Sequence, residues 1–275
     1  MEQLPQINDD SGKLVSALAR GVQILRCFTV DTPALSARAL IDSTRLPKPT
    51  FFRLATTLCA AGLLRYSEAS GAFMIAPGLL TLASSVWARI HVRQLAFGQM
   101  QALADRVRGQ VTLALGAGLE LVFVELAQSK ECTTYRPAMG GHISLSRTAT
   151  GRAYLAALPP EQLQRYVDGV QAADPRQGQW LAERLAETRD DLQQHGFCVN
   201  RGDLHRELQA VAVPVRSSTP DDEIHVFTCT VAVFELTPGQ LEDDIGPRLV
   251  ALARNTEAAL GHSPGSDDPR WAATP

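Results

Sequence analysis

Residues 47–62 decide the fold of the first part of the chain, and they read Pro-Lys-Pro-Thr-Phe-Phe-Arg-Leu-Ala-Thr-Thr-Leu-Cys-Ala-Ala-Gly. Proline has no amide hydrogen and its φ is fixed near the helical value, so the two prolines predict the first turn of a helix. Gly62 is expected to end this helix. The apolar residues recur at helical spacing and form the expected buried face: Phe51, Leu54, Leu58 and Ala61. The opposite face carries Thr50, Phe52, Arg53, Thr56 and Thr57.

The residues on either side predict two more helices and a β-hairpin. Apolar residues line one helical face in residues 15–28, and Ser36 is placed to cap a short second helix that turns Leu40 inward. Residues 44–46 form the turn before the third helix. Residues 63–66 and 72–75 read as two short strands around a turn. We therefore predict an all-α winged helix-turn-helix with a β-hairpin wing over residues 14–78.

Charge is distributed unevenly along the chain. The 275 residues carry a formal net charge of −3, but residues 13–65 alone carry a net charge of +6. A small basic module on a larger acidic body is typical of a protein whose first part meets a polyanion. Solvated helix faces would account for the same excess, so charge alone leaves both interpretations open.

A winged helix-turn-helix lays its third helix in the major groove of double-stranded DNA and its wing beside the phosphates. Arg53 would reach guanine or a phosphate, and Lys48 and Thr50 lie where helix amides favour an anion. Helix-turn-helix units also contact proteins, so an adaptor remains an alternative. The candidate DNA-binding residues are Arg38, Arg45, Lys48, Thr50, Phe52, Arg53 and Arg65.

The remaining pattern predicts a second domain. A linker helix is expected over residues 79–91, followed by an α+β domain over residues 92–262. This domain would begin with an amphipathic helix and a β-hairpin. Later strands are expected at residues 209–215 and 224–233, and helices at residues 160–170, 180–195 and 240–260. Residues 1–13 and 263–275 are expected to be flexible tails.

Several stretches resemble IclR-type bacterial transcriptional regulators. Residues 16–25 (Ser-Ala-Leu-Ala-Arg-Gly-Val-Gln-Ile-Leu), 46–54 and 62–64 are similar to the family's N-terminal domain, and residues 73–80 to the segment after its wing. Residues 140–153 (Gly-Gly-His-Ile-Ser-Leu-Ser-Arg-Thr-Ala-Thr-Gly-Arg-Ala), 195–197 and 211–215 are similar to its effector domain. One departure is Arg45, where the family usually has glycine. Arg45 would cost about 1 kcal/mol in a left-handed turn, unless the turn is rebuilt or a phosphate contact compensates.

The resemblance implies a GAF-like effector-binding domain that binds a small metabolite, often a carboxylate or an aromatic acid. It also implies a homodimer or homotetramer. The implied effector-binding residues are Tyr135, Ile143, Ala149, Thr150, Asn200, Ala210, Thr228 and Thr230. The helix-start amides of Ala149 and Thr150 would hold a carboxylate.

Other residues near the implied pocket differ from the family pattern, so the resemblance does not determine which ligand binds. The family commonly has an acidic pair where this chain has Gly202 and Asp203, a glycine in place of Glu207, and a carboxylate or similar polar group at Asn200. Arg147 and Arg152 flank the pocket, where they would either neutralise an acidic effector or lie on the outer face of a helix.

The alternative of a metabolite-processing enzyme with an accessory helix-turn-helix domain finds little support in motifs. The sequence has no nucleophile elbow, phosphate cradle or dinucleotide fingerprint, and the best nucleophile candidate is Cys198 near His195. Cysteine and histidine spacings indicate no metal site, and no cofactor is expected. The acidic first residues and the lack of a long apolar run predict a cytoplasmic protein without membrane spans.

Overall fold

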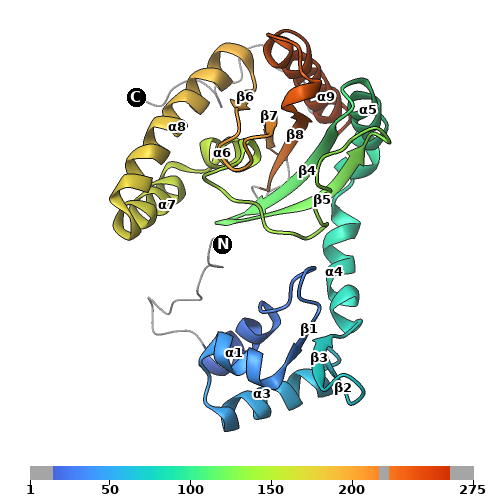
Figure 1. Ribbon diagram of the computed structural model, residues 1–275, viewed down its shortest axis with the longest axis vertical. Coiled ribbons are helices and arrows are strands. Elements are labelled where there is room, and N and C mark those ends of the chain that lie inside the picture. The colour runs from blue at the N-terminus through green and yellow to red at the C-terminus, as the bar shows by residue number, and fades with distance from the viewer. Residues whose placement is uncertain (1–14, 217–222, 261–275) are drawn as a thin grey trace. The chain divides into compact units, whose positions relative to one another are not determined.

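The computed structural model describes residues 15–216 and 223–260, and the chain divides into two compact units between Ile90 and His91 (Figure 1). The two tails expected to be flexible, residues 1–13 and 263–275, lie outside the described residues. Each unit has a hydrophobic core of its own.

The first unit is a winged helix-turn-helix, as predicted. Its order is α1 (Ser16–Leu25), β1 (Ala34–Ser36), α2 (Ala37–Thr44), α3 (Lys48–Ala60), β2 (Leu64–Ser67), β3 (Ala72–Ile75) and α4 (Gly78–Arg89). The strand β1 was not predicted, and it pairs antiparallel with β3 at the edge of the wing. A segment of three residues is too short to show the alternation of apolar and polar residues that predicts a strand. Residues 34–36 form a strand only because they pair with β3 of the wing. The core contains Ile24, Leu40, Leu46, Phe51, Ala55, Leu58, Leu64 and Phe73.

Local chemistry explains where α2 and α3 begin and end. The Ser36 hydroxyl accepts a hydrogen bond from the amide of Ala39 at 3.2 Å, which caps α2 as expected. The helix ends at Arg45, which keeps a left-handed conformation with φ of 54°. The predicted buried face of α3 was wrong at Ala61, which is exposed, whereas Ala55 is buried. Ala55 lies one turn after Phe51, so the buried stripe follows Phe51, Ala55 and Leu58.

Gly78 determines how α4 begins. A Cβ atom at this position would lie 2.2 Å from the carbonyl oxygen of Gly62, so only glycine allows the start of α4 to approach the end of α3 so closely. The helix then runs to Arg89 and has no buried residue.

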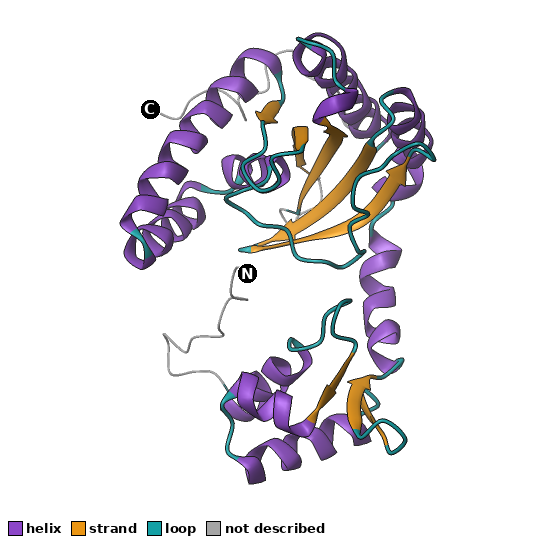
Figure 2. Ribbon diagram, viewed as in Figure 1, coloured by secondary structure: helices purple, strands orange, loops and turns teal. Residues whose placement is uncertain are grey.

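The second unit is an α+β domain, as predicted. Its antiparallel sheet has the order β5-β4-β8-β7-β6, and helices cover both faces (Figure 2). Helices α5 and α9 pack on one face, and α6 packs on the other with α8 and α7 outside it. The strands are β4 (Gln110–Ala117), β5 (Glu120–Gln128), β6 (Cys198–Asn200), β7 (Leu208–Arg216) and β8 (Ile224–Ala232). The helices are α5 (Val92–Arg106), α6 (Ala149–Ala157), α7 (Pro160–Ala173), α8 (Pro175–His195) and α9 (Gly246–Ala259).

Two details of this unit differ from the expected pattern. The short edge strand β6 was missed for the same reason as β1. The last helix was expected over residues 240–260, but it opens with a π-helical turn, Leu241–Ile245, before α9. None of the helices in the described ranges is both long enough and apolar enough to span a bilayer.

The helix α6 lies very close to the sheet. A Cβ atom at Gly116 would lie 2.1 Å from the ring of Tyr154, so glycine on β4 makes room for that ring. The Tyr154 hydroxyl donates a hydrogen bond to the carbonyl oxygen of Gly118 at 2.9 Å, and burial raises the pKa of Tyr154 to about 12. This contact fixes α6 against the sheet.

Candidate DNA-binding surface and ligand pocket

The exposed face of α3 carries the central part of the candidate DNA surface. Lys48, Phe52 and Arg53 are exposed there, and Thr50 is half-buried. The ring of Phe52 remains 42% exposed although it packs edge-to-face on the buried Phe51, with centroids 5.3 Å apart. An apolar ring beside two cations suits a groove, because it can meet a thymine methyl group while the cations meet phosphates or guanine.

The other candidate DNA-binding residues are also exposed on the first unit. Arg38 on α2 lies 3.8 Å from Asp42, and both side chains are so exposed that this pair holds Arg38 only weakly. Arg45 lies in the left-handed turn before α3. Arg65 lies on β2, where its Nη2 contacts the Met74 sulfur at 3.5 Å. The structure therefore presents the turn, α3 and the wing as one module with exposed cations.

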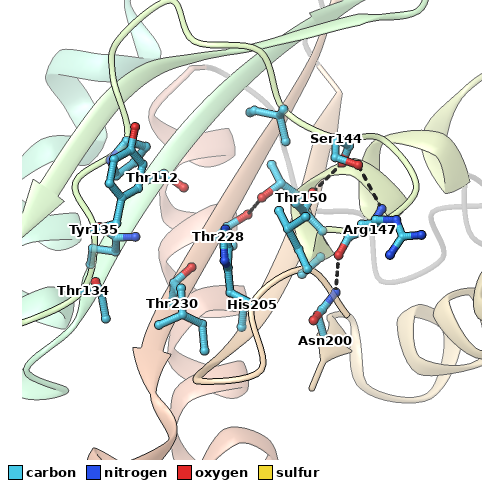
Figure 3. Close-up of a pocket in the computed structure, with 18 of the residues that line it drawn as sticks. Thr112, Thr134, Tyr135, Ser144, Arg147, Thr150, Asn200, His205, Thr228 and Thr230 are labelled. Carbon is cyan, nitrogen blue, oxygen red and sulfur yellow. Dashed lines mark hydrogen bonds between the residues drawn. The ribbon is translucent and has the colours of Figure 1, made fainter. Parts of the chain in front are cut away.

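The second unit contains a cavity of about 400 Å³ between the sheet and α6. It lies on the sheet face that α6 covers, and Figure 3 shows that side chains from both sides of the cavity point into it. All the effector-binding residues implied by the sequence resemblance line it: Tyr135, Ile143, Ala149, Thr150, Asn200, Ala210, Thr228 and Thr230.

Two polar strand residues that were not predicted belong to the same cavity. In the antiparallel pairing of β4 with β8, Gln110 lies opposite Thr230 and Thr112 lies opposite Thr228. All four side chains line the cavity. A signal existed in the sequence, because Gln110 and Thr112 alternate with the apolar Val111 and Leu113. In a sheet covered by helices on both faces, such polar residues must face the interior.

The N-terminus of α6 forms one end of the cavity. The Thr148 hydroxyl accepts a hydrogen bond from the amide of Gly151 at 2.9 Å, and the Thr148 carbonyl accepts one from the amide of Arg152. The amides of Ala149 and Thr150 are the first two of the helix and have no acceptor within it. They are available to a ligand, and the helix dipole favours a negative group beside them.

Asn200 lines the cavity, but its side-chain amide is already hydrogen-bonded within the protein. Its Nδ2 donates to the Arg147 carbonyl at 2.9 Å and to Asp203 Oδ2 at 3.2 Å. Its Oδ1 accepts from the amides of Gly202 and Asp203 at 2.9 and 3.1 Å. Since both hydrogens and both lone pairs are used, Asn200 positions the loop after β6 rather than offering a free polar group.

Arg152 does not lie on an outer helix face, and this alternative from the sequence was wrong. It is 2% exposed, and its Nη1 lies 2.6 Å from Asp203 Oδ2. Its guanidinium also donates to the carbonyl oxygens of Ser146 and Val199. This buried ion pair neutralises Arg152 and ties α6 to β6 and to the loop that follows it.

Arg147 precedes α6 and lines the cavity, so it is not on an outer helix face either. Its Nη2 donates to Gln177 Oε1 at 3.0 Å, and its guanidinium carbon lies 5.5 Å from the centre of the Trp180 ring. Among the described residues no carboxylate pairs with Arg147, and its guanidinium is held by Gln177 and Trp180 of α8.

Cys198, the candidate nucleophile, is too deeply buried for that role. Cys198 is fully buried, its thiol donates to the Ala149 carbonyl at 3.7 Å, and burial raises the pKa of the Cys198 thiol to about 12. A thiol with that pKa is not a nucleophile near neutral pH. Within the described ranges, no histidine, cysteine and carboxylate groups gather as a metal site.

A winged helix-turn-helix followed by an α+β unit with a polar cavity defines a class of protein, the ligand-responsive DNA-binding regulators. Comparisons with known proteins agree with this class and narrow it. The family profile described as "Bacterial transcriptional regulator IclR C-terminal" matches residues 84–234, and the "IclR helix-turn-helix domain" matches residues 17–68. The chain belongs to the IclR family of bacterial transcriptional regulators, with a DNA-binding helix-turn-helix and a C-terminal effector-binding domain.

Individual relatives cover nearly the whole chain. The HTH-type transcriptional regulator TsaQ1/TsaQ2 of Comamonas testosteroni is 26% identical over 260 residues, which cover 93% of this chain and 92% of that protein. An IclR family regulator from Brucella abortus is 32% identical, with a TM-score of 0.79 over 92% of this chain and 95% of that one. An IclR homolog from Microbacterium hydrocarbonoxydans, complexed with 4-hydroxybenzoate, shares the fold with a TM-score of 0.70 at 22% identity, over 90% and 100% of the two chains.

Proposed function

We propose that the cavity of the second unit binds a small organic acid and that this binding changes the affinity of the winged unit for operator DNA. The observation that carries the proposal is the cavity of about 400 Å³, which all the implied effector-binding residues line. Its volume lies within the range of about 300 to 1,000 Å³ typical of small-molecule sites.

The polar groups around α6 favour a carboxylate. The free amides of Ala149 and Thr150 would donate to its oxygens at the positive end of the helix. Arg152 contributes no free charge because Asp203 neutralises it, whereas Arg147 lines the cavity without a carboxylate partner among the described residues. The relative from Microbacterium hydrocarbonoxydans carries an aromatic carboxylate, 4-hydroxybenzoate, which is of the proposed class.

The DNA complex would place α3 in the major groove. Arg53 would contact a base, whereas Arg38, Arg45, Lys48 and Arg65 would contact phosphates and fix the register. Two copies in a homodimer or homotetramer would meet half-sites about one helical turn or a multiple apart. Leu80, Leu82 and Val86 of α4 are exposed apolar residues on a helix without a buried residue, and they support contact with a second copy.

The acid would act through its different affinities for two states of the protein. It can shift the DNA affinity only by the ratio of those affinities, and DNA must change the affinity for the acid by the same factor. This reciprocity gives an independent check, because operator DNA would alter the dissociation constant of the acid.

The test is a thermal-shift screen of organic acids, followed by retardation of a DNA fragment from beside the protein's own gene. An acid at about 100 times its dissociation constant adds about 2.7 kcal/mol to the stability of the domain that binds it. We expect at least one acid to raise the melting temperature and to change the retarded fraction. No stabilisation by any acid, or no DNA retardation at low salt, would contradict the proposal. Turnover of a bound acid would favour the enzyme alternative.

A further inference from the structure

Two buried oxygen atoms on β4 face the cavity without a hydrogen-bond partner. Gln110 is 6% exposed and Thr112 is 2% exposed, and both line the cavity. Within the described part of the chain, neither Gln110 Oε1 nor Thr112 Oγ1 has a hydrogen-bond partner. Leaving a buried polar group unsatisfied costs about 1 to 3 kcal/mol, so two of them on one strand need an explanation.

These two oxygens lie apart from the end of the cavity that suits a carboxylate. Figure 3 shows Thr112 and Tyr135 on one side of the Thr150 and Thr228 pair, with Arg147 and Asn200 on the other side. The hydroxyls of Thr150 and Thr228 lie 2.9 Å apart, bond to each other and stand between these two groups of residues. The register places Gln110 beside Thr230, on the same inner face of the sheet as Thr112.

The chemistry of the two oxygens selects their partner. A carbonyl oxygen such as Gln110 Oε1 only accepts hydrogen bonds, so a carboxylate placed there would face a second acceptor. A ligand hydroxyl could donate to Gln110 Oε1 and accept from the Thr112 hydroxyl. The one carboxylate among the described lining residues is Glu207, which is exposed and lies 3.8 Å from His205, so a buried ammonium group would find no buried charged partner there. A neutral hydroxyl group therefore fits best.

We propose that Gln110 and Thr112 form a hydroxyl subsite, and that the effector is an organic acid with a hydroxyl group at the end opposite its carboxylate. This inference rests on the proposed function, because it takes the carboxylate to lie at the N-terminus of α6. The subsite sets specificity: an acid without the distal hydroxyl leaves both oxygens unsatisfied and binds more weakly.

The test compares matched ligands on the full-length protein by isothermal titration calorimetry. The pairs are 4-hydroxybenzoate with benzoate, and 4-hydroxyphenylacetate with phenylacetate. We expect the hydroxy acid of at least one pair to bind about tenfold or more tightly than its partner. A neutral pair, phenol with toluene, tests the subsite without a carboxylate.

Variants connect the preference to the two residues. Thr112→Val keeps the side-chain shape and removes the hydroxyl, and Gln110→Met removes the carbonyl. Each should lower the ratio of affinities toward one, because it removes a hydrogen bond to the hydroxy acid and also removes the unsatisfied oxygen that benzoate would bury. Thr256→Val is the matched control, because Thr256 is buried on α9 away from the cavity and bonds to the Leu252 carbonyl. Circular dichroism establishes that each variant is folded, and the ligand pairs need no variant at all.

The possible results separate the two proposals. Equal affinities within every pair would overturn the hydroxyl subsite and leave the proposed acid-binding function standing. A ratio that survives both Thr112→Val and Gln110→Met would also overturn the subsite. If no acid binds while phenol binds more tightly than toluene and Thr112→Val removes that preference, the subsite stands and the acid-binding function fails. No binding by any of these ligands would overturn the hydroxyl subsite, and the proposed function would fail as well if no acid of the thermal-shift screen stabilises the protein.

Discussion

The two units of this protein recognise their partners by opposite physical means. The winged unit presents exposed cations, which meet a partner of high charge and remain in water until they bind. The second unit encloses uncharged threonine and glutamine groups, and Arg152, the one fully buried cation among its described residues, is held in an internal ion pair. Exposed charges give affinity that falls with salt, whereas buried hydrogen-bonding groups give specificity that salt affects little.

The largest effect should come from breaking the internal ion pair. Asp203→Ala leaves the buried Arg152 without its carboxylate, and we expect the second unit to lose about 3 to 5 kcal/mol of stability. Urea denaturation followed by circular dichroism would measure the loss. Asp42→Ala is the matched control in the winged unit, because its partner Arg38 is exposed, and it should change stability by less than about 1 kcal/mol. Similar losses for both variants would contradict the contrast between the units.

The exposed cations should separate into base and phosphate contacts. We expect Arg53→Ala to weaken specific DNA binding by about 1 to 3 kcal/mol, because it would remove a base contact. Lys48→Ala should reduce the slope of log affinity against log salt by about 1 and should weaken all sequences alike. Retardation assays at several salt concentrations, with operator and scrambled DNA, would measure both. An unchanged affinity and slope in both variants would remove these residues from the DNA surface.

The interior of the second unit should make stability depend on pH. Burial lowers the pKa of His225 to about 4 in the folded protein, below its ordinary value of 6.5. Between these values the unfolded chain binds a proton that the folded protein does not, so stability falls as pH falls from 7 toward 4. At pH 5 the His225 contribution should be a loss of about 2 kcal/mol relative to pH 7. His225→Leu should remove that part of the pH dependence in denaturation curves at both pH values, and an unchanged dependence would contradict the buried neutral imidazole.

The smallest expected effect concerns Arg45, which combines backbone strain with a candidate phosphate contact. Arg45→Gly relieves the left-handed conformation and should stabilise the winged unit by about 1 kcal/mol, while DNA binding weakens. Arg45→Ala removes the charge and keeps the strain, so it should weaken DNA binding equally without the gain in stability. If neither variant weakens DNA binding, Arg45 contacts no phosphate.

The sequence predicted an element correctly where the residues within that element show a helical or alternating pattern or a capping residue. The prolines before Phe51, the cap at Ser36 and the alternation of Val111, Leu113 and Leu115 predicted helices and strands that the structure contains. The strands β1 and β6 were not predicted, and each is only three residues long. Such strands exist only because a neighbouring strand supplies hydrogen bonds, and the residues of the short strand do not indicate which segment that neighbour is.

For the cavity, the sequence resemblance indicated which residues line it but not which of their polar groups are free. The family resemblance implied eight lining residues, and all of them line the cavity. Those residues do not play equal parts, because the amide of Asn200 is used by the loop after β6 and the hydroxyls of Thr150 and Thr228 bond to each other. The sequence does not contain this information, since a side chain's free donors and acceptors depend on which partners the fold brings within reach.

The sequence by itself therefore determined the order of the two units, the basic helix-turn-helix and the membership of the family, because these depend on residue types and spacings along the chain. Only the tertiary structure decided that Arg152 is neutralised by Asp203 and that Gln110 and Thr112 face the cavity with unsatisfied oxygens. Both outcomes depend on contacts between segments far apart in the chain. Burial then makes those contacts matter, because a polar group without water must find its partner in the protein or in a ligand.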